Sequence, residues 1–229
     1  MDTHHCPLCG TSAVSGGRAL SRLYCICPLC DLRFIPPAFH LSPAQEYARY
    51  LLHQNSGANT GYVKFLMVAV ECLKNHLSKT HQGAPTVLDY GSGPGPVLVE
   101  LLNQHGFAAV GYDPHFGDQS VPGIVVTASL VGQGPFDAVV STETVEHFRT
   151  PRIEWKKMIA LIRPGGFLVV VTSLVVPGID LSKWHYANDP THIVFYSEST
   201  FRYIAEQWGL SLVETNGRHW VVMQKNLTS

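Results

Sequence analysis

The chain has 229 residues and a formal net charge of −1, and hydrophobic residues make up 45% of it. This length suits one α/β domain with a short appendage and allows a sizeable core. The balanced charge argues against a protein that binds polyanions such as nucleic acids, and no apolar stretch is long enough for a membrane span.

The first segment, residues 1–36, is rich in cysteine, glycine and proline. Cys-Pro-Leu-Cys occurs in it twice, with 17 residues between the two copies. A C-x2-C pair can form a tight turn that presents two thiolates to one ion, and this spacing is typical of zinc sites. The sequence therefore predicts a zinc-ribbon-like module whose four ligands are Cys6, Cys9, Cys27 and Cys30.

Four thiolates fill the zinc coordination shell, so we expect the ion to be structural. Cys25 is an alternative to Cys27 as a ligand. Zinc would fold a segment that is too short for a core of its own, and partial contact with a substrate is a second role for it. Metal ligation rather than disulfides fits a reducing compartment. The start MDTHHCPLCG is not typical of a signal peptide, and we expect a cytoplasmic protein.

Residues 37–82 are expected to form a helical cap region. Ser42 is suited to cap a helix that has Pro43 in its first turn. From Tyr62 onward, apolar residues recur at helical spacing, which favours a helix packed on the main core. These residues are Phe65, Leu66, Ala69, Val70, Leu73 and Leu77.

Strands and helices then alternate through residues 83–229, which predicts a doubly wound α/β domain. We expect a mostly parallel, seven-stranded sheet. Its last two strands flank Asn216-Gly217, which favours a two-residue hairpin and an antiparallel edge strand. The expected strands are 86–90, 107–113, 123–127, 136–141, 167–173, 210–215 and 218–224, and the expected helices are 96–105, 152–162 and 199–209, with the Pro164-Gly165-Gly166 turn after the second helix.

A glycine-rich loop with Gly91, Gly93 and Gly95 joins the first of these strands to its helix. Glycines allow a tight turn and let a ligand approach the backbone. Pro96 stands where a dinucleotide-binding loop has its third glycine. Asp89 would repel a pyrophosphate but attract the ammonium of an amino acid, such as that of S-adenosylmethionine. Asp113 ends the second strand, where a carboxylate can accept hydrogen bonds from ribose hydroxyls.

These motifs resemble those of the class I (Rossmann-like) S-adenosylmethionine-dependent methyltransferases. VLDYGSGPG, VGYDP, FDAVVSTETVEHF and LIRPGGFLVV match, in order, the first, second and fourth motifs and the turn and strand that follow. The resemblance covers roughly residues 60–225. It is strongest to the branch that contains the ubiquinone- and menaquinone-pathway methyltransferases.

The resemblance implies a role for each matching position. Asp89, Gly91 and Gly93 would contact the methionine part and Asp113 the ribose, and Pro114 and His115 would lie near the adenine. Ala128 and Ser129 match the adenine-edge site, where many relatives have an acid that this chain lacks. Thr142 and Glu143 would line the face where the methyl group is transferred.

Two histidines are candidates for catalysis or substrate binding, because the imidazole pKa lies near neutral pH. His147 follows the fourth strand, at the sheet edge where ligands bind. His192 lies in the long loop after the fifth strand, in a D-P-x-H sequence that relatives share. His185 is a weaker candidate. A second metal site made of His185, Asp189 and His192 is a further alternative.

The sequence therefore predicts a methyltransferase that uses S-adenosylmethionine and acts on an oxygen or carbon atom of a small-molecule acceptor. One alternative is an RNA methyltransferase with a zinc finger, against which the charge balance argues. The other alternative is a binding protein without activity on the same scaffold. The sequence does not indicate the oligomeric state or the acceptor.

Overall fold

The computed structural model describes residues 4–52, 55–77, 83–117, 126–127, 129–130 and 132–227. Its larger sheet has seven strands in the order β11-β12-β9-β8-β5-β6-β7. The bounds of these strands are β5 (Thr86–Tyr90), β6 (Ala108–Tyr112), β7 (Val126–Thr127), β8 (Phe136–Thr142), β9 (Ile162–Val171), β11 (Leu210–Thr215) and β12 (Trp220–Lys225).

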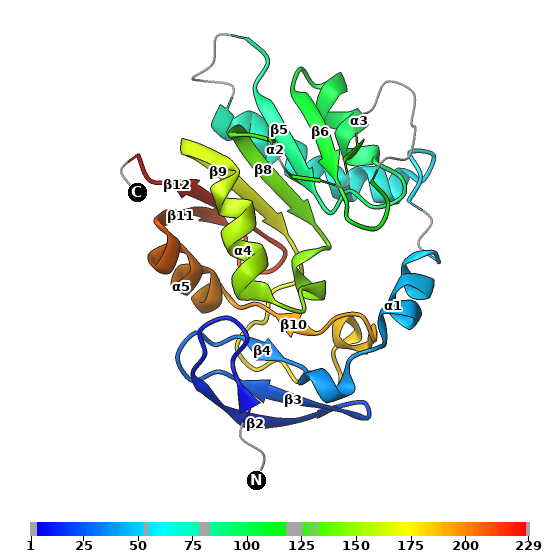
Figure 1. The fold of residues 1–229 in the computed structure, drawn as a ribbon, viewed down its shortest axis with the longest axis vertical. Helices are drawn as coiled ribbons and strands as arrows, with labels where there is room; N and C mark the ends of the chain where they lie inside the picture. Colours follow the sequence, from blue (N-terminus) through cyan, green and yellow to red (C-terminus); the bar gives the residue numbers. More distant parts are fainter. Residues whose placement is uncertain are drawn as a thin grey trace.

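Helices cover both faces of this sheet (Figure 1). They are α2 (Thr60–Leu77) and α3 (Val97–Gln104) on one face, and α4 (Pro151–Ala160) and α5 (Glu198–Trp208) on the other. Side chains alternate between the faces along each strand. In β9, Val169 and Val171 pack with α2, whereas Leu168 and Val170 pack with α4 and α5. The central strands are therefore buried on both sides, which explains their continuous apolar sequences.

The terminal hairpin differs from the prediction in two ways. β12 runs antiparallel to both of its neighbours, so the antiparallel strand lies next to the edge strand β11 rather than at the edge. The turn has four residues, not two, because the Asn216 side chain accepts hydrogen bonds from the backbone N–H groups of Arg218, His219 and Trp220 at 2.8–3.2 Å. Side-chain hydrogen bonding thus replaces the tight turn.

The Pro164-Gly165-Gly166 segment also differs from the prediction, because it lies within β9 rather than before the strand. Phe136 pairs with Ile162, and Ala138 then pairs with Phe167. The segment therefore forms a bulge in the ladder, and Gly165 has a φ of +75° that favours glycine.

The helical caps follow the sequence closely. Ser42 caps α1 (Pro43–Tyr50), and its hydroxyl accepts a hydrogen bond from the N–H of Gln45. Gly209 ends α5 with a φ of +68°. In α2 the predicted apolar stripe packs against the main sheet. No helix in the described part of the chain has the length and apolar character needed to cross a bilayer.

The N-terminal strands form a second, five-stranded sheet with the order β1-β2-β3-β4-β10. Residues 4–36 lie beneath β10 and α5 in Figure 1, in dark blue. They share one core with α4 and α5, because the buried cysteines, Leu8, Leu32 and Phe34 pack in the same cluster as Trp155 and Phe201. The strands are β1 (His4–His5), β2 (Ser12–Ala19), β3 (Arg22–Ile26), β4 (Arg33–Phe34) and β10 (Val194–Phe195).

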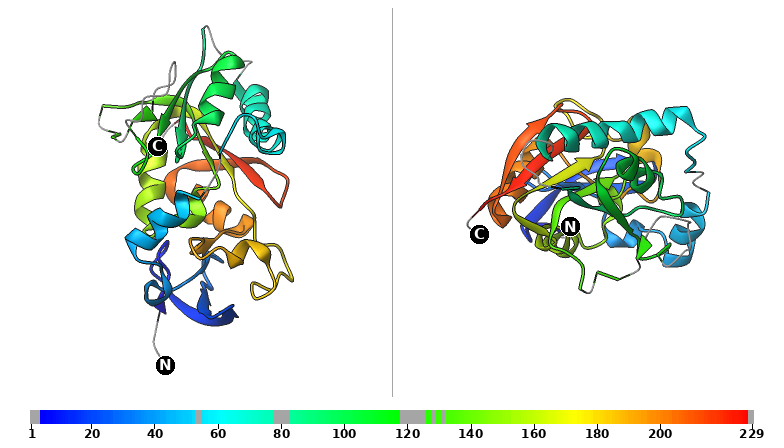
Figure 2. Two further views of the ribbon diagram at one scale, coloured as in Figure 1. Left: turned by 90° about the vertical axis from the view of Figure 1, so that its right-hand side faces the viewer. Right: turned by 90° about the horizontal axis from the view of Figure 1, so that it is seen from above.

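Short 3₁₀ helices connect several of these elements: η1 (Pro37–Phe39), η2 (Val145–His147) and η3 (His185–Asn188). The left view in Figure 2 shows α1, in light blue, between the main sheet and the dark-blue N-terminal strands. The carboxyl ends of β5, β6 and β8 therefore face α1 and the loop after β9.

Candidate active site

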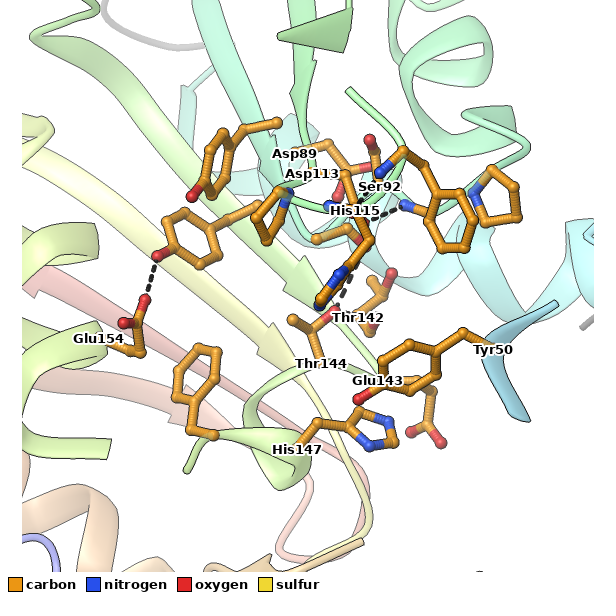
Figure 3. Close-up of a pocket in the computed structure, with 18 of the residues that line it drawn as sticks. Tyr50, Asp89, Ser92, Asp113, His115, Thr142, Glu143, Thr144, His147 and Glu154 are labelled. Carbon is orange, nitrogen blue, oxygen red and sulfur yellow. Dashed lines mark hydrogen bonds between the residues drawn. The ribbon is translucent and has the colours of Figure 1, made fainter. Parts of the chain in front are cut away.

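A cavity of about 640 Å³ opens at the carboxyl ends of β5, β6 and β8. α1 contributes Glu46 and Tyr50 to one wall, and Figure 3 shows Tyr50 facing the loops at the strand ends. Nine of the eleven catalytic and cofactor-binding residues expected from the sequence line it: Asp89, Gly91, Gly93, Asp113, Pro114, Thr142, Glu143, His147 and His192.

Asp89 is the most unusual group in this cavity. Its side chain is 2% exposed, and its Oδ1 atom has no hydrogen-bond partner among the described residues. Burial, together with the nearby charge of Asp113, raises the pKa of Asp89 to about 8. A cationic group beside Asp89 would provide the missing partner and favour the ionised carboxylate.

The glycine loop packs closely against its neighbours at two of its three glycines. The N–H groups of Gly91 and Ser92 donate to the carbonyl of Tyr112, so β6 holds the loop in place. Gly91 has a φ of +88°, and a Cβ atom there would lie 2.3 Å from the Thr144 side chain. A Cβ atom on Gly95 would lie 2.4 Å from the carbonyl oxygen of Asn55. Glycine is therefore required at positions 91 and 95 for steric reasons.

Asp113 organises the adjacent side of the cavity. Its Oδ2 accepts a hydrogen bond from the N–H of Gly93 at 2.9 Å. Its Oδ1 accepts from the N–H groups of His115 and Phe116 at 2.8 and 3.0 Å. Oδ2 has further acceptor capacity, so the same group can also accept from a hydroxyl of a bound ligand.

The end of β8 carries Thr142 and Glu143. Glu143 has a φ of +47°, which is uncommon for a residue other than glycine and is typical of functional sites. Its side chain lines the cavity. Loss of contact with water there, and then the nearby charge of Glu146, raise the pKa of Glu143.

His147 and His192 come together at the base of the cavity, with ring centroids 4.8 Å apart. The Nδ1 atom of His147 lies 3.0 Å from the carbonyl oxygen of Thr191, and that of His192 lies 2.7 Å from the carbonyl oxygen of Tyr186. A carbonyl can only accept, so each Nδ1 carries the proton and each Nε2 is the basic atom. Burial, and then the proximity of His147, lowers the pKa of His192.

Glu146 completes this group, and it is fully buried. Its carboxylate accepts hydrogen bonds from the hydroxyls of Tyr186 and Thr172 at 2.5 and 3.0 Å. Ligand atoms of Glu146, His147 and His192 lie within 4.8 Å of one another, a grouping that could hold a metal ion. The alternative set of His185, Asp189 and His192 forms no such group in the described part of the chain.

Two ion pairs fix α1 over the cavity. Arg149 donates from Nε and Nη2 to Glu46 Oε2 at 3.0 and 2.8 Å, and Arg49 Nη2 lies 3.3 Å from Asp189 Oδ2. Burial works against ionisation of Asp189, but hydrogen bonds from Thr191 outweigh it, and the pKa of Asp189 falls to about 2. Asp189 therefore stays charged and links α1 to the loop that bears His192.

A second cavity of about 690 Å³ adjoins the first. Phe65, Glu143 and His192 line both cavities, so these three residues stand at the junction. Phe65 and Trp220 contribute apolar walls, and His185 lies at its edge as an exposed side chain. The first cavity therefore lies next to the glycine loop, and the second lies beyond His192.

The two predicted adenine-edge residues are not part of the described cavity. Ser129 is exposed and does not line the cavity. Ala128 lies outside the described residues. His115 and Phe116, beside Asp113, occupy the wall where an adenine would lie if the carboxylate binds a ribose.

The four predicted cysteine ligands converge at the other end of the molecule. Ligand atoms of Cys6, Cys9, Cys27 and Cys30 lie within 4.8 Å of one another, whereas Cys25 is outside the group. The Sγ atoms of Cys9 and Cys27 are 3.3 Å apart, close to the ~3.8 Å edge of a tetrahedron with Zn–S bonds of about 2.3 Å. The cluster therefore has the donor type and spacing of a zinc site.

The structure also brings in residues that sequence reasoning missed. Glu146 adjoins His147 in the sequence, yet only its buried contacts with Tyr186 and Thr172 indicate a role. The hydroxyl of Tyr90 donates a hydrogen bond to Glu154 at 2.6 Å in the wall of the cavity. Figure 3 marks this bond with the dashed line at Glu154. No sequence pattern would have linked these pairs, because their members lie in separate elements.

A family model described as Methyltransferase domain matches residues 62–215, which is more than half of the chain. An uncharacterised methyltransferase of Mycobacterium bovis is 31% identical over 115 residues, covering 45% of this chain and 57% of the relative. The ubiquinone biosynthesis O-methyltransferase of Caulobacter vibrioides is 30% identical over 102 residues, covering 38% of this chain and 40% of the relative. The chain thus spans little more than half the length of the first of these relatives.

Two solved structures share the fold at low sequence identity. The 1,6-didemethyltoxoflavin-N1-methyltransferase of Burkholderia thailandensis, with its substrate and S-adenosylhomocysteine bound, has a TM-score of 0.57 and 16% identity. The similarity covers 93% of this chain and 99% of that one. The magnesium protoporphyrin IX methyltransferase of Synechocystis, with bound S-adenosylhomocysteine, has a TM-score of 0.55 and 16% identity, over 82% of this chain and 96% of that one.

Proposed function

Because the chain belongs to this methyltransferase domain family, we propose that it transfers a methyl group from S-adenosylmethionine to an oxygen or carbon atom of a small-molecule acceptor. The observation that carries the proposal is the buried Asp89 carboxylate, whose Oδ1 lacks a partner among the described residues beside a cavity-forming glycine loop. A buried carboxylate without a counter-charge is unfavourable, and an amino-acid ammonium would compensate it.

The residues present fit this cofactor. Asp89 would hold the ammonium, and Gly91 and Gly93 would let the methionine part approach the backbone. The Oδ2 atom of Asp113 has the acceptor capacity for a ribose hydroxyl in addition to the three backbone hydrogen bonds of the carboxylate. Pro114 would flank the adenine.

The cofactor would supply an activated methyl group, and the protein would supply alignment and proton transfer. Thr142 and Glu143 would line the transfer face. His192 is suited to act as the general base, because its Nε2 is the basic atom and its lowered pKa keeps it neutral at pH 7. His147 has the same proton arrangement and would orient the acceptor or share the proton.

Two further observations support a small acceptor. The cavity beyond His192 has apolar walls with several hydrogen-bonding groups, as small-molecule sites do. The two solved structures named above, which share the fold, are a 1,6-didemethyltoxoflavin-N1-methyltransferase and a magnesium protoporphyrin IX methyltransferase. The net charge of −1 offers no general attraction for a nucleic acid.

We also propose that Cys6, Cys9, Cys27 and Cys30 hold one structural zinc ion. All four ligands come from the protein, which leaves no open position for a substrate. The ion would connect the turn before β2 to the turn after β3 and so stabilise residues 1–36, which have few large apolar side chains of their own.

The direct test is a screen of acceptor classes with S-adenosylmethionine that carries a labelled methyl group. Wild type should label at least one phenol, enol or similar acceptor, whereas Asp89→Asn should lose this labelling. Asp180→Asn is the matched control, because Asp180 is exposed and outside both cavities. Labelling that is equal in all three proteins would contradict the assignment of the cofactor site.

A further inference from the structure

Arg22, at the start of β3, is buried to an extent that is unusual for a cation, with 8% of the residue exposed. Its guanidinium donates to four backbone carbonyls of the loop after β9. The acceptors are Ala187 at 2.7 Å, Asp189 at 3.0 Å, Pro190 at 3.0 Å and His192 at 3.1 Å. Two bonds leave from each Nη nitrogen, so all four Nη hydrogens have an acceptor.

These four carbonyls belong to a segment that has little regular structure to satisfy them. It consists of the end of η3 and the residues that lead to β10. Backbone carbonyls that are buried without a partner cost free energy comparable to a lost hydrogen bond. Arg22 therefore fixes the path of the loop at four points, and the last of these is His192 itself.

The N-terminal cysteine-bearing segment, to which Arg22 belongs, also holds the chain just after His192. Ile35 donates its N–H to the carbonyl of Ile193 at 2.8 Å, and Arg33–Phe34 pairs with Val194–Phe195. The backbone on both sides of the His192 side chain is thus hydrogen-bonded to the N-terminal cysteine-bearing segment, residues 4–36. The orientation of the His192 ring depends on this path, because its Nδ1–H must reach the Tyr186 carbonyl at 2.7 Å.

The N-terminal cysteine-bearing segment affects the cavities only indirectly. No described residue of the segment 4–36 lines either cavity. The sequence-based expectation that this segment partly contacts the substrate therefore finds no support at these cavities. The buried cation instead reaches the site through the backbone of one loop.

We infer that Arg22 is a positioning residue that holds the His192 imidazole in place for proton removal from the acceptor, and that the cysteine module serves the reaction through it. The role in proton removal rests on the proposed methyltransferase function. The positioning of the ring does not depend on that function, and it can be measured on the free protein.

The primary test is an NMR titration of the His192 ring in ¹⁵N-histidine-labelled protein, without any acceptor. In wild type, His192 should carry its proton on Nδ1 and titrate below the usual value of about 6.5. In Arg22→Ala the loop loses four hydrogen bonds, and the ring should titrate closer to that usual value, with a mixture of tautomers. Arg22→Lys, which has only three donors and no planar fork, should give an intermediate result.

Arg18→Ala is the matched control, because Arg18 lies on the adjacent strand β2 and its Nη1 donates to the Ser21 carbonyl at 2.7 Å on the surface. It should leave the His192 signals unchanged. A folded Arg22→Ala or Arg22→Lys protein whose His192 titrates as in wild type would overturn the inference. If Arg22→Ala does not fold, Arg22→Lys alone decides between the two outcomes.

Activity provides a second readout once an acceptor has been found. Arg22→Ala should lower kcat about 100-fold, the order expected when a reacting group is displaced by about 1 Å, with little change in cofactor affinity. Added guanidinium ion should restore part of kcat in this variant, whereas methylammonium should not. A parallel loss of folded protein, cofactor binding and kcat, without guanidinium rescue, would indicate a purely structural role. If wild type binds no S-adenosylmethionine, the proposed function fails, while the NMR result still decides the positioning of His192.

Discussion

The rings of His147 and His192 meet edge to face with their centroids 4.8 Å apart, although they come from different loops of the sheet. Both rings donate Nδ1–H to carbonyls of the loop after β9. His147 donates to the carbonyl of Thr191, and His192 donates to the carbonyl of Tyr186. Burial, and then the proximity of His147, lower the pKa of His192. The His192 ring therefore provides a neutral base beside the cavity near neutral pH.

Replacing His192 by Gln should lower kcat by about 10²–10⁴-fold, the usual contribution of a general base. The affinity for S-adenosylmethionine should stay nearly unchanged. In wild type, kcat should fall as the pH drops through a pKa below about 6.5, because burial and the proximity of His147 lower the pKa of His192. His105→Gln, on the exposed end of α3, is the control. A His192→Gln enzyme with an unchanged pH profile would exclude His192 as the base.

Gly91→Ala should abolish cofactor binding or weaken it by about tenfold or more, equivalent to at least ~1.4 kcal/mol. The new Cβ would lie 2.3 Å from the Thr144 side chain, in a loop that already has a φ of +88°. Gly106→Ala is a matched control, because Gly106 has the same φ, but a Cβ atom there would meet no described atom within 4 Å. Titration calorimetry on both variants separates backbone strain from the steric clash. An equal loss of cofactor affinity in the two variants would mean that the tight contact between Gly91 and Thr144 is unimportant for binding.

Cys27→Ala should remove the bound zinc, whereas Cys25→Ala should retain one ion per chain. Both thiols are buried, but only Cys27 belongs to the four-cysteine group. Loss of the metal should also lower the melting temperature markedly, because metal binding contributes directly to the folding free energy of such modules. Metal analysis with thermal unfolding checks both points. Zinc retained by Cys27→Ala but lost by Cys25→Ala would reverse the ligand assignment.

Asp89→Asn should stabilise the ligand-free protein at alkaline pH. The pKa of Asp89 is raised from 3.8 to about 8 in the folded state. Protonation is therefore favoured by folding, and the associated stability is present below about pH 4 and lost as the pH rises through 8. Asn cannot ionise, so the variant does not lose this stability. Its free energy of unfolding should therefore rise relative to that of wild type, by up to about a few kcal/mol across that range. Urea unfolding at several pH values tests this, and a constant difference would contradict the buried, unpaired carboxylate.

The sequence predicted the position of the glycine loop in the fold, because local patterns decide it. A strand, a glycine loop and a helix in succession determine where Asp89 lies, because the loop must follow the carboxyl end of the strand. The Ser42 cap and the stripe of α2 are likewise local. The sequence could not predict the four-residue turn, because that turn depends on which backbone groups the Asn216 side chain can reach.

Contacts between distant segments could not be predicted from the sequence either. Arg22 and the carbonyls that it binds are separated by most of the chain. Glu146 is an ordinary charged residue in the sequence, and only the fold buries it against Tyr186 and Thr172. Both residues depend on how the loop after β9 packs, and a single sequence contains no periodic signal for that packing.

The most direct measurement is calorimetric titration of S-adenosylmethionine into wild type and Asp89→Asn near pH 7, in buffers of different ionisation enthalpy. The account predicts binding to wild type with release of about one proton, because Asp89 is largely protonated when free and ionised beside the ammonium. Asp89→Asn should bind more weakly and release almost none. Equal affinity and equal proton release in the two proteins would contradict the assignment of Asp89, and the absence of binding to folded wild type would contradict the methyltransferase account as a whole.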